Sequence, residues 1–185
     1  VAVGASYDIG GGFSAAAGAQ FTESGIGTKE NADQVALNFA YTADSYGASV
    51  TYANYENGAS HSDYYTALNA YYSFDNGMSI SGGYEVGTIG NIRQEQDETI
   101  AYFVGVETEV GPGTFGAALG TQGAIQEEYV SGGGSKFEEE MMYEAYYSYE
   151  VNDGMTITPL IYIQEDKESQ KPDRTGIMVK TSFSF

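Results

Sequence analysis

The side chains with the greatest capacity for chemistry in this sequence are its carboxylates. The 185 residues include 26 Asp and Glu against 7 Lys and Arg, so the formal net charge is −19. Carboxylates arranged around a water-filled passage raise the local concentration of cations and repel anions. The same excess argues against nucleic acid as a partner, because phosphates require clustered Lys and Arg. The composition therefore favours small cations as binding partners.

The sequence offers little to an enzyme. The single histidine, His61, is flanked by Ser60, Ser62 and Asp63. Residues adjacent along a loop seldom converge as nucleophile, base and orienting carboxylate. The chain has no cysteine, which excludes disulfides and thiolate metal sites. Phosphate-binding loops and nucleophile motifs are not found either. We therefore expect no catalytic residues, no cofactor and no resident metal.

The elements that carry the carboxylates have the two-residue period of β-strands. In 34–43, for example, Val35, Leu37 and Phe39 share one face, and Asn38 lies on the other. No apolar run approaches the roughly 20 residues that a spanning helix needs. We predict about eleven strands, at about 1–9, 12–23, 34–43, 46–56, 64–75, 78–88, 99–110, 114–126, 141–151, 155–165 and 175–185.

The connections between these strands alternate in length. Short Gly-rich or Asp/Asn-containing turns are expected at 10–12, 44–45, 75–77, 111–113 and 152–154. Longer polar loops are expected at about 24–33, 57–63, 89–98, 127–140 and 166–174. Strands of roughly ten residues with short turns on one side and long loops on the other are typical of outer-membrane barrels. We therefore predict an all-β fold, an antiparallel transmembrane β-barrel.

Charged residues at the strand centres alternate with the apolar ones, whereas Glu23, Glu56 and Glu165 break this rule at the loop-side ends of their strands. A charge that faces lipid costs up to about 2–4 kcal/mol at the midplane, which explains why the two kinds of residue are on opposite faces. Asp8 follows the same rule, and Lys180 is the only basic residue within a predicted strand. We predict that the charged face lines a pore, with these residues in it: Glu85, Glu107, Glu109, Glu144, Glu150 and Lys180.

Aromatic residues on the apolar face gather near the short turns. Rings at the membrane–water boundary form belts in membrane proteins, because one part of the ring is apolar and another can meet water. Tyr64 and Tyr143 are candidates for the belt on the loop side. The predicted girdle on the short-turn side consists of Tyr7, Phe13, Tyr46, Phe74, Phe115, Tyr149 and Phe183.

The strand count bears on domain organisation. The last strand follows a long loop, so it runs toward the periplasm, and counting back through eleven strands gives the first the same direction. A bacterial single-chain barrel has an even number of strands with both ends on the periplasmic side. We therefore interpret 1–185 as one barrel segment, the C-terminal part of a larger barrel, for which a total of about 16 strands is suitable.

The last hairpin resembles that of a known family. Val151-Asn152-Asp153-Gly154-Met155-Thr156-Ile157-Thr158-Pro159, an acidic loop, and 175–185 ending in Phe185 resemble the final hairpin of cyanobacterial outer-membrane porins. Those porins carry an N-terminal surface-layer-homology domain and are related to carbohydrate-selective porins. The resemblance implies a homotrimer for passive diffusion of small hydrophilic solutes and inorganic ions. It also implies that the N-terminal strands and that domain lie outside this chain.

The resemblance has further implications for partners. The terminal Phe185 would be the signal that the barrel-assembly machinery recognises. Apart from the resemblance, acidic loop runs such as Glu138-Glu139-Glu140 are either a solvated surface or sites at which divalent cations bridge to lipopolysaccharide, since carboxylates are hard oxygen ligands.

Two alternatives to a cation-preferring porin remain open. One is a non-conducting structural or adhesive barrel, whose lumen would be filled by bulky inward side chains. Small residues such as Gly83, Gly105 and Gly116 leave space on the charged face, although Tyr71 and Tyr146 also lie there. The other is a soluble acidic β-sandwich binding module, in which the aromatic rings would fill a core between two sheets.

Overall fold

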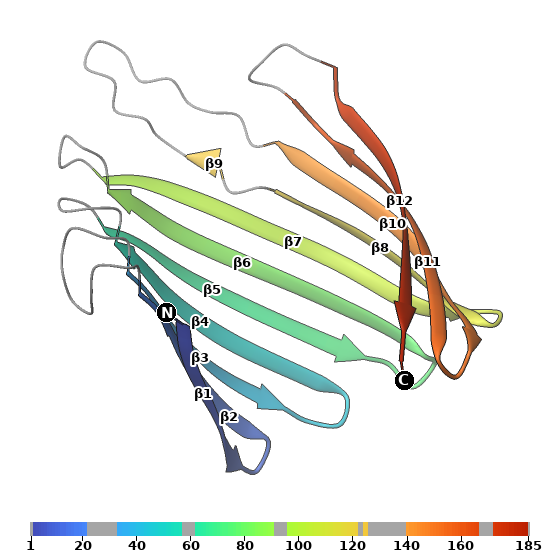
Figure 1. The fold of residues 1–185 in the computed structure, drawn as a ribbon, viewed down its shortest axis with the longest axis horizontal. Helices are drawn as coiled ribbons and strands as arrows, with labels where there is room; N and C mark the ends of the chain where they lie inside the picture. The colour runs from blue at the N-terminus through green and yellow to red at the C-terminus, as the bar shows by residue number, and fades with distance from the viewer. Residues whose placement is uncertain are drawn as a thin grey trace.

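The structure is a computed structural model, which describes residues 2–21, 33–56, 62–90, 96–121, 124–125, 140–166 and 172–184. These residues contain no helix long and apolar enough to cross a membrane. They form one antiparallel sheet (Figure 1), whose strands are β1 (Ala2–Gly10), β2 (Phe13–Gln20), β3 (Gln34–Thr42), β4 (Tyr46–Glu56), β5 (Ser62–Ser73), β6 (Met78–Gly90), β7 (Gln96–Val110), β8 (Gly113–Thr121), β9 (Ala124–Ile125), β10 (Met141–Asn152), β11 (Met155–Gln164) and β12 (Arg174–Phe183).

The sheet is a meander in which neighbours along the chain are neighbours in space. Its order is β1 to β8 and then β10, β11 and β12, which confirms the predicted all-β antiparallel fold of eleven principal strands. The predicted strand 114–126 is interrupted. The end of this predicted strand forms β9, in which Ile125 pairs with Thr99 of β7. Compared with the Phe103–Gly120 pair of β7 and β8, the pairing register is shifted by one residue.

The short turns lie along one end of the sheet, as Figure 1 shows. Three of them contain the same local hydrogen bond, in which a side-chain oxygen accepts from the backbone N–H two residues later. The pairs are Asp8 Oδ1 with Gly10 N at 2.8 Å, Asn76 Oδ1 with Met78 N at 3.1 Å, and Asn152 Oδ1 with Gly154 N at 3.0 Å. Asp and Asn are favoured in turns for this reason.

Positive φ angles occur at the turn glycines, where a side chain would strain the backbone. Gly11 has φ +63° and Gly12 has φ +87°, and Gly77 and Gly111 are similar. Gly154 does not adopt a positive φ, so the last short turn differs from the turns at Gly77 and Gly111.

The sheet is curved and open. In Figure 1, β1 and β12 lie at its two edges, and no ladder joins them. A second sheet is absent from the described part of the chain, and none of its hydrophobic side chains is buried. A β-sandwich needs a core between two sheets. The sandwich alternative is therefore wrong.

We predict that replacing Gly12 by Ala destabilises the protein more than replacing Gly11 does. Both glycines have positive φ, but an added Cβ at Gly12 would overlap the carbonyl oxygen of Thr42, whereas nothing lies within 4 Å of the position at Gly11. A strained residue costs about 1–3 kcal/mol, and the overlap places Gly12→Ala at the upper end. Urea unfolding of the membrane-inserted protein measures the free energy of unfolding of both variants. Equal losses would contradict the overlap with the Thr42 carbonyl oxygen as the cause.

Candidate functional site

The ladder register divides the sheet into two faces, because residues directly opposite each other share a face. Glu107 is opposite Gly116, and Gly116 is opposite Tyr146. One row across the sheet runs from Glu109 through Thr114, Ser148 and Thr158 to Lys180. Continuing through every ladder places all six predicted pore-lining residues on one face, which we call the carboxylate face: Glu85, Glu107, Glu109, Glu144, Glu150 and Lys180.

The opposite face, which we call the apolar face, carries uncovered hydrophobic side chains. Leu68 is 59% exposed, and Ile177 on β12 reaches 79%. All but four of the exposed large hydrophobic residues in the described chain alternate onto this face. The four exceptions are Tyr71, Phe103, Met142 and Met178. A water-soluble protein rarely exposes so continuous an apolar surface, so this face requires a hydrocarbon environment.

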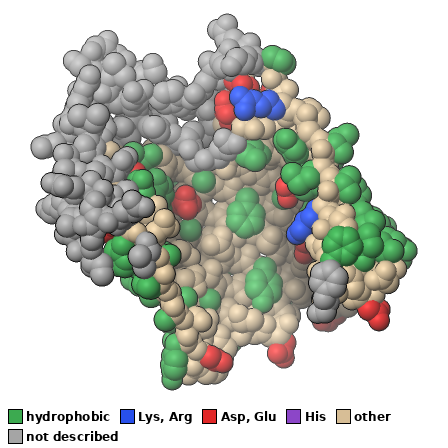
Figure 2. All heavy atoms as spheres, in the orientation of Figure 1, with side chains coloured by type: hydrophobic (Ala, Val, Ile, Leu, Met, Phe, Trp, Pro, Cys, Tyr) green, Lys and Arg blue, Asp and Glu red, His purple; other side chains and the backbone are tan. Residues whose placement is uncertain are grey.

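The sheet is hollowed on one side. Figure 2 shows acidic and basic side chains in the hollow and at its rim, some hydrophobic side chains at its centre, and more hydrophobic side chains along its outer margins. The concave side is therefore the carboxylate face, and the apolar face is convex. This arrangement suits a barrel wall with water inside and lipid outside.

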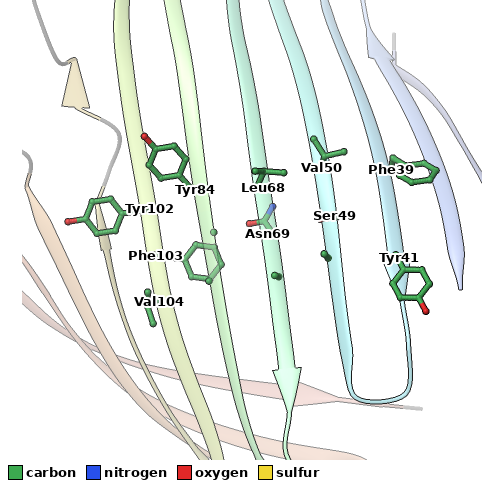
Figure 3. Close-up of a pocket in the computed structure, with 14 residues that line it drawn as sticks. Phe39, Tyr41, Ser49, Val50, Leu68, Asn69, Tyr84, Tyr102, Phe103 and Val104 are labelled. Carbon is green, nitrogen blue, oxygen red and sulfur yellow. The ribbon is translucent and has the colours of Figure 1, made fainter.

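A groove of about 710 Å³ crosses the apolar face between β3 and β7. Its floor consists of small residues, Ala48, Ala70 and Gly82, and its walls include Leu68 and Tyr84. Figure 3 shows Phe39, Val50, Leu68 and Tyr84 in a row along one wall. The groove offers almost no polar atoms for chemistry, so it belongs to the hydrocarbon-facing surface.

The seven predicted girdle residues all alternate onto the apolar face near the short turns, with exposures between 37% for Phe74 and 72% for Tyr7. Their rings contact further aromatic residues that the prediction missed. Phe13 and Tyr41 have ring centroids 4.7 Å apart, and Tyr72 and Phe74 are 4.8 Å apart. Tyr41 and Tyr72 have the same alternation as the predicted set, which was the signal for including them. The interfacial role of the set stays a prediction.

Several sequence predictions concern residues outside the described part of the chain. These include Phe185, the proposed assembly signal, His61, and the acidic loop run at 138–139. Within the described part, Lys180 forms no ion pair with a carboxylate. Arg174 instead pairs with Asp166 across the last hairpin, at 3.5 Å.

Aromatic rings on the carboxylate face lie across glycines of the neighbouring strands. An added Cβ at any of these glycines would overlap the ring of its cross-strand partner. Rings held flat in this way lie against the wall instead of projecting into the hollow. The sequence suggested that small inward residues leave open space. The rings that cover these glycines show that not all of them do. The pairs are Gly47 with Tyr71, Gly87 with Tyr65, Gly83 with Phe103, Gly116 with Tyr146, and Gly176 with Tyr162.

One of these rings reaches a carboxylate. The Tyr146 side chain on β10 crosses Gly116 on β8, and its hydroxyl donates a hydrogen bond to Glu107 Oε1 on β7. Because Gly116 has no side chain, the ring can pass over β8 and join two strands that are not adjacent. Glu107 is thereby held at a defined place on the wall.

The carboxylates differ in their height along the sheet. Glu109 and Glu150 lie beside the short turns that follow β7 and β10, since each pairs with a residue close to the start of the next strand. Glu85 pairs with Ala101 and Ala67, farther toward the other end. The carboxylate face thus carries negative charge at more than one level along the strands.

Comparisons with known proteins agree with this geometry. The family of Gram-negative porins matches residues 2–169. The chain belongs to this family, which is a family of outer-membrane proteins. No match was found among curated protein sequences.

Two solved structures share the fold. An anion-selective porin from Comamonas acidovorans matches with a TM-score of 0.77 at 16% identity, over 100% of this chain and 59% of its own. A porin refined at 1.8 Å resolution matches with a TM-score of 0.71 at 18% identity, over 97% of this chain and 60% of its own. The chain thus spans about 60% of the length of these porins. At such identities the likeness concerns the fold and leaves solute preference open.

We predict opposite outcomes for arginine at two adjacent positions of β5. Leu68 lies on the apolar face and Ala67 on the carboxylate face, opposite Glu85. Leu68→Arg should lower the free energy of unfolding from lipid vesicles by about 2–4 kcal/mol, because the charge would face hydrocarbon. Ala67→Arg should change the free energy of unfolding little, since water and the Glu85 carboxylate can stabilise the added charge. Equal losses would contradict the assignment of the two faces.

We also predict that Gly116→Ala lowers the free energy of unfolding by about 1 kcal/mol, because the ring of Tyr146 would have to leave its place beside Glu107. Gly105→Ala is the matched control, since the nearest atom to its added Cβ is the small Ser81 hydroxyl oxygen at 3.1 Å. Equilibrium unfolding in vesicles measures the difference. If the two substitutions cost the same, the ring does not depend on the missing side chain.

Proposed function

We propose that this chain is part of an outer-membrane porin that lets small hydrophilic solutes and inorganic ions diffuse passively. The observation that carries the proposal is the single curved sheet with an apolar convex face and a charged concave face. Such a sheet is useful where hydrocarbon and water are separated by one layer of protein, which is the situation in a membrane channel. Membership of the Gram-negative porin family supports the same function.

The two free edges support a barrel that is closed by further strands. In hydrocarbon, each unpaired backbone N–H or C=O costs several kcal/mol, and β1 and β12 have no ladder partner on their outer sides. We propose that strands outside this chain pair with both edges, giving a closed wall of about 16 strands. We call this sheet together with those strands the complete barrel.

Cation preference is the finer part of the proposal. The carboxylate face carries Glu85, Glu107, Glu109, Glu144 and Glu150 against Lys180 and Arg174, and Arg174 is paired with Asp166. A surplus of carboxylates in a water-filled passage concentrates cations. The similar structure from Comamonas acidovorans is described as anion-selective, but selectivity depends on lumen side chains, which 16% identity leaves free to differ.

The filled-lumen alternative finds little support on this wall. The inward rings that could have blocked the passage lie across glycines, so their bulk is taken up within the wall. A trimer, contacts with lipopolysaccharide and the assembly machinery, and the cyanobacterial group with its surface-layer domain remain predictions. The upstream sequence of the protein tests the last of these directly.

Planar-bilayer recording of the complete barrel tests the function. We expect stepwise insertion of open channels and a reversal potential in a potassium chloride gradient that indicates preference for the cation. Absence of channels would overturn the porin proposal. Channels that prefer chloride would overturn the charge argument alone.

We predict that the double substitution Glu85→Gln and Glu144→Gln lowers the potassium-to-chloride permeability ratio by about fivefold. Each carboxylate contributes roughly 0.5 kcal/mol to a cation about 8 Å away in water. Glu56→Gln is the control, because Glu56 alternates onto the apolar face at the end of β4. An unchanged ratio in the double variant would show that these carboxylates merely hydrate the wall.

A further inference from the structure

Two aromatic rings are exposed on the side of the sheet where water is expected. Tyr71 and Phe103 are each 40% exposed, and both alternate onto the carboxylate face. An exposed phenylalanine on a polar surface is more informative than one on an apolar surface, because no lipid is available to cover it. One part of the Phe103 ring packs across Gly83, and the remaining part is exposed to the hollow.

These two rings border a niche of about 290 Å³ on the carboxylate face. Between them lie the side chains of Ser49, Asn69 and Ser81, and none of the described residues that line the niche is charged. This is unusual for a wall with a large surplus of carboxylates. A niche without charge has no electrostatic preference for cations or for anions. Its ligand should therefore be neutral.

Gly83 lies beside the niche, between Phe103 and Asn69 in the sheet. The Phe103 ring reaches it from β7 and the Asn69 carboxamide reaches it from β5, and an added Cβ at Gly83 would overlap both Phe103 Cε1 and Asn69 Oδ1. Figure 3 shows the Phe103 ring lying across β6 and Asn69 on the neighbouring strand beside it. A flat apolar surface and an amide are thus placed side by side.

The Asn69 carboxamide has no hydrogen-bond partner in the described protein. Asn38, on the same face, donates to Thr51 Oγ1 at 2.8 Å. A half-buried amide normally finds a partner, and an amide can donate two hydrogen bonds and accept two. Asn69 is therefore free to bond a molecule that enters the niche, whereas Asn38 is already engaged.

We propose that this niche binds a neutral, ring-shaped, polyhydroxylated solute such as a monosaccharide; the proposal rests on the porin function above. The C–H face of the sugar ring would stack on Phe103, because both surfaces are apolar and flat. Its hydroxyl groups would bond Asn69, Ser49 and Ser81. A volume of about 290 Å³ is at the small end of the range for ligand sites, which suits one sugar ring.

The test is current noise in single channels of the complete barrel, with D-glucose as probe and glycerol as the acyclic control. We expect glucose to produce concentration-dependent interruptions of the current, and glycerol to produce none. Phe103→Ala and, separately, Asn69→Ala should each raise the glucose concentration for half-maximal effect by at least tenfold. Phe115→Ala on the apolar face and Asn38→Ala should leave that concentration within twofold.

The ion conductance in the same recording separates the two proposals. Channels that conduct potassium chloride but show no response to glucose would overturn the niche while leaving the porin function intact. The same holds if glucose acts but Phe103→Ala and Asn69→Ala respond as the unmodified barrel does. Because the first of these outcomes needs no substitution, the niche can be refuted even if both variants fail to insert.

Discussion

The structure depends on one constraint, that hydrocarbon touches one face of a single protein layer and water touches the other. A β-strand meets this constraint through its two-residue alternation, provided that the register never slips. The long ladders of β4 to β7 keep the register over whole strands. The apolar face can then remain uncovered by protein, and the fold needs no buried core in the usual sense.

Glycine has a second role in this wall beyond the turns. Each of the five ring–glycine pairs joins a flat side chain to a position without a Cβ, so packing occurs within the sheet instead of between two layers. Cross-strand pairs of this kind stabilise a sheet and fix its register. They also keep aromatic bulk out of the passage. The pairs use four of the 17 tyrosines and five of the 25 glycines.

Much of this fold could be predicted from the sequence, because its determinants are local. The alternation in 34–43 or 99–110 predicts strands, the residues at 10–12, 75–77 and 152–154 predict turns, and the parity of the Glu residues predicts the faces. The interruption between β8 and β9 had no such local signal. The prediction for the girdle was incomplete, since it omitted Tyr41 and Tyr72, which share the alternation of the predicted set and contact it through their rings.

The contacts across strands could not be predicted, since they depend on which residues become opposite. Nothing in the sequence near Tyr146 indicates Glu107, which is 39 positions away. The ladders through Gly116 bring them together. Likewise, Asn69 and Phe103 meet only because Gly83 lies between them in the sheet. A shift of one residue in the register of their strands would move Asn69, Gly83 and Phe103 to the apolar face.

The arrangement of charge and neutral surface on this wall has a physical consequence. The neutral niche lies between two charged levels, since Glu85 is two residues beyond Gly83 on β6 and Glu107 is four residues beyond Phe103 on β7. The carboxylates act on cations over several ångströms through water, whereas stacking and hydrogen bonding act only at contact. A single wall can therefore enrich cations and hold an uncharged ring without either property limiting the other.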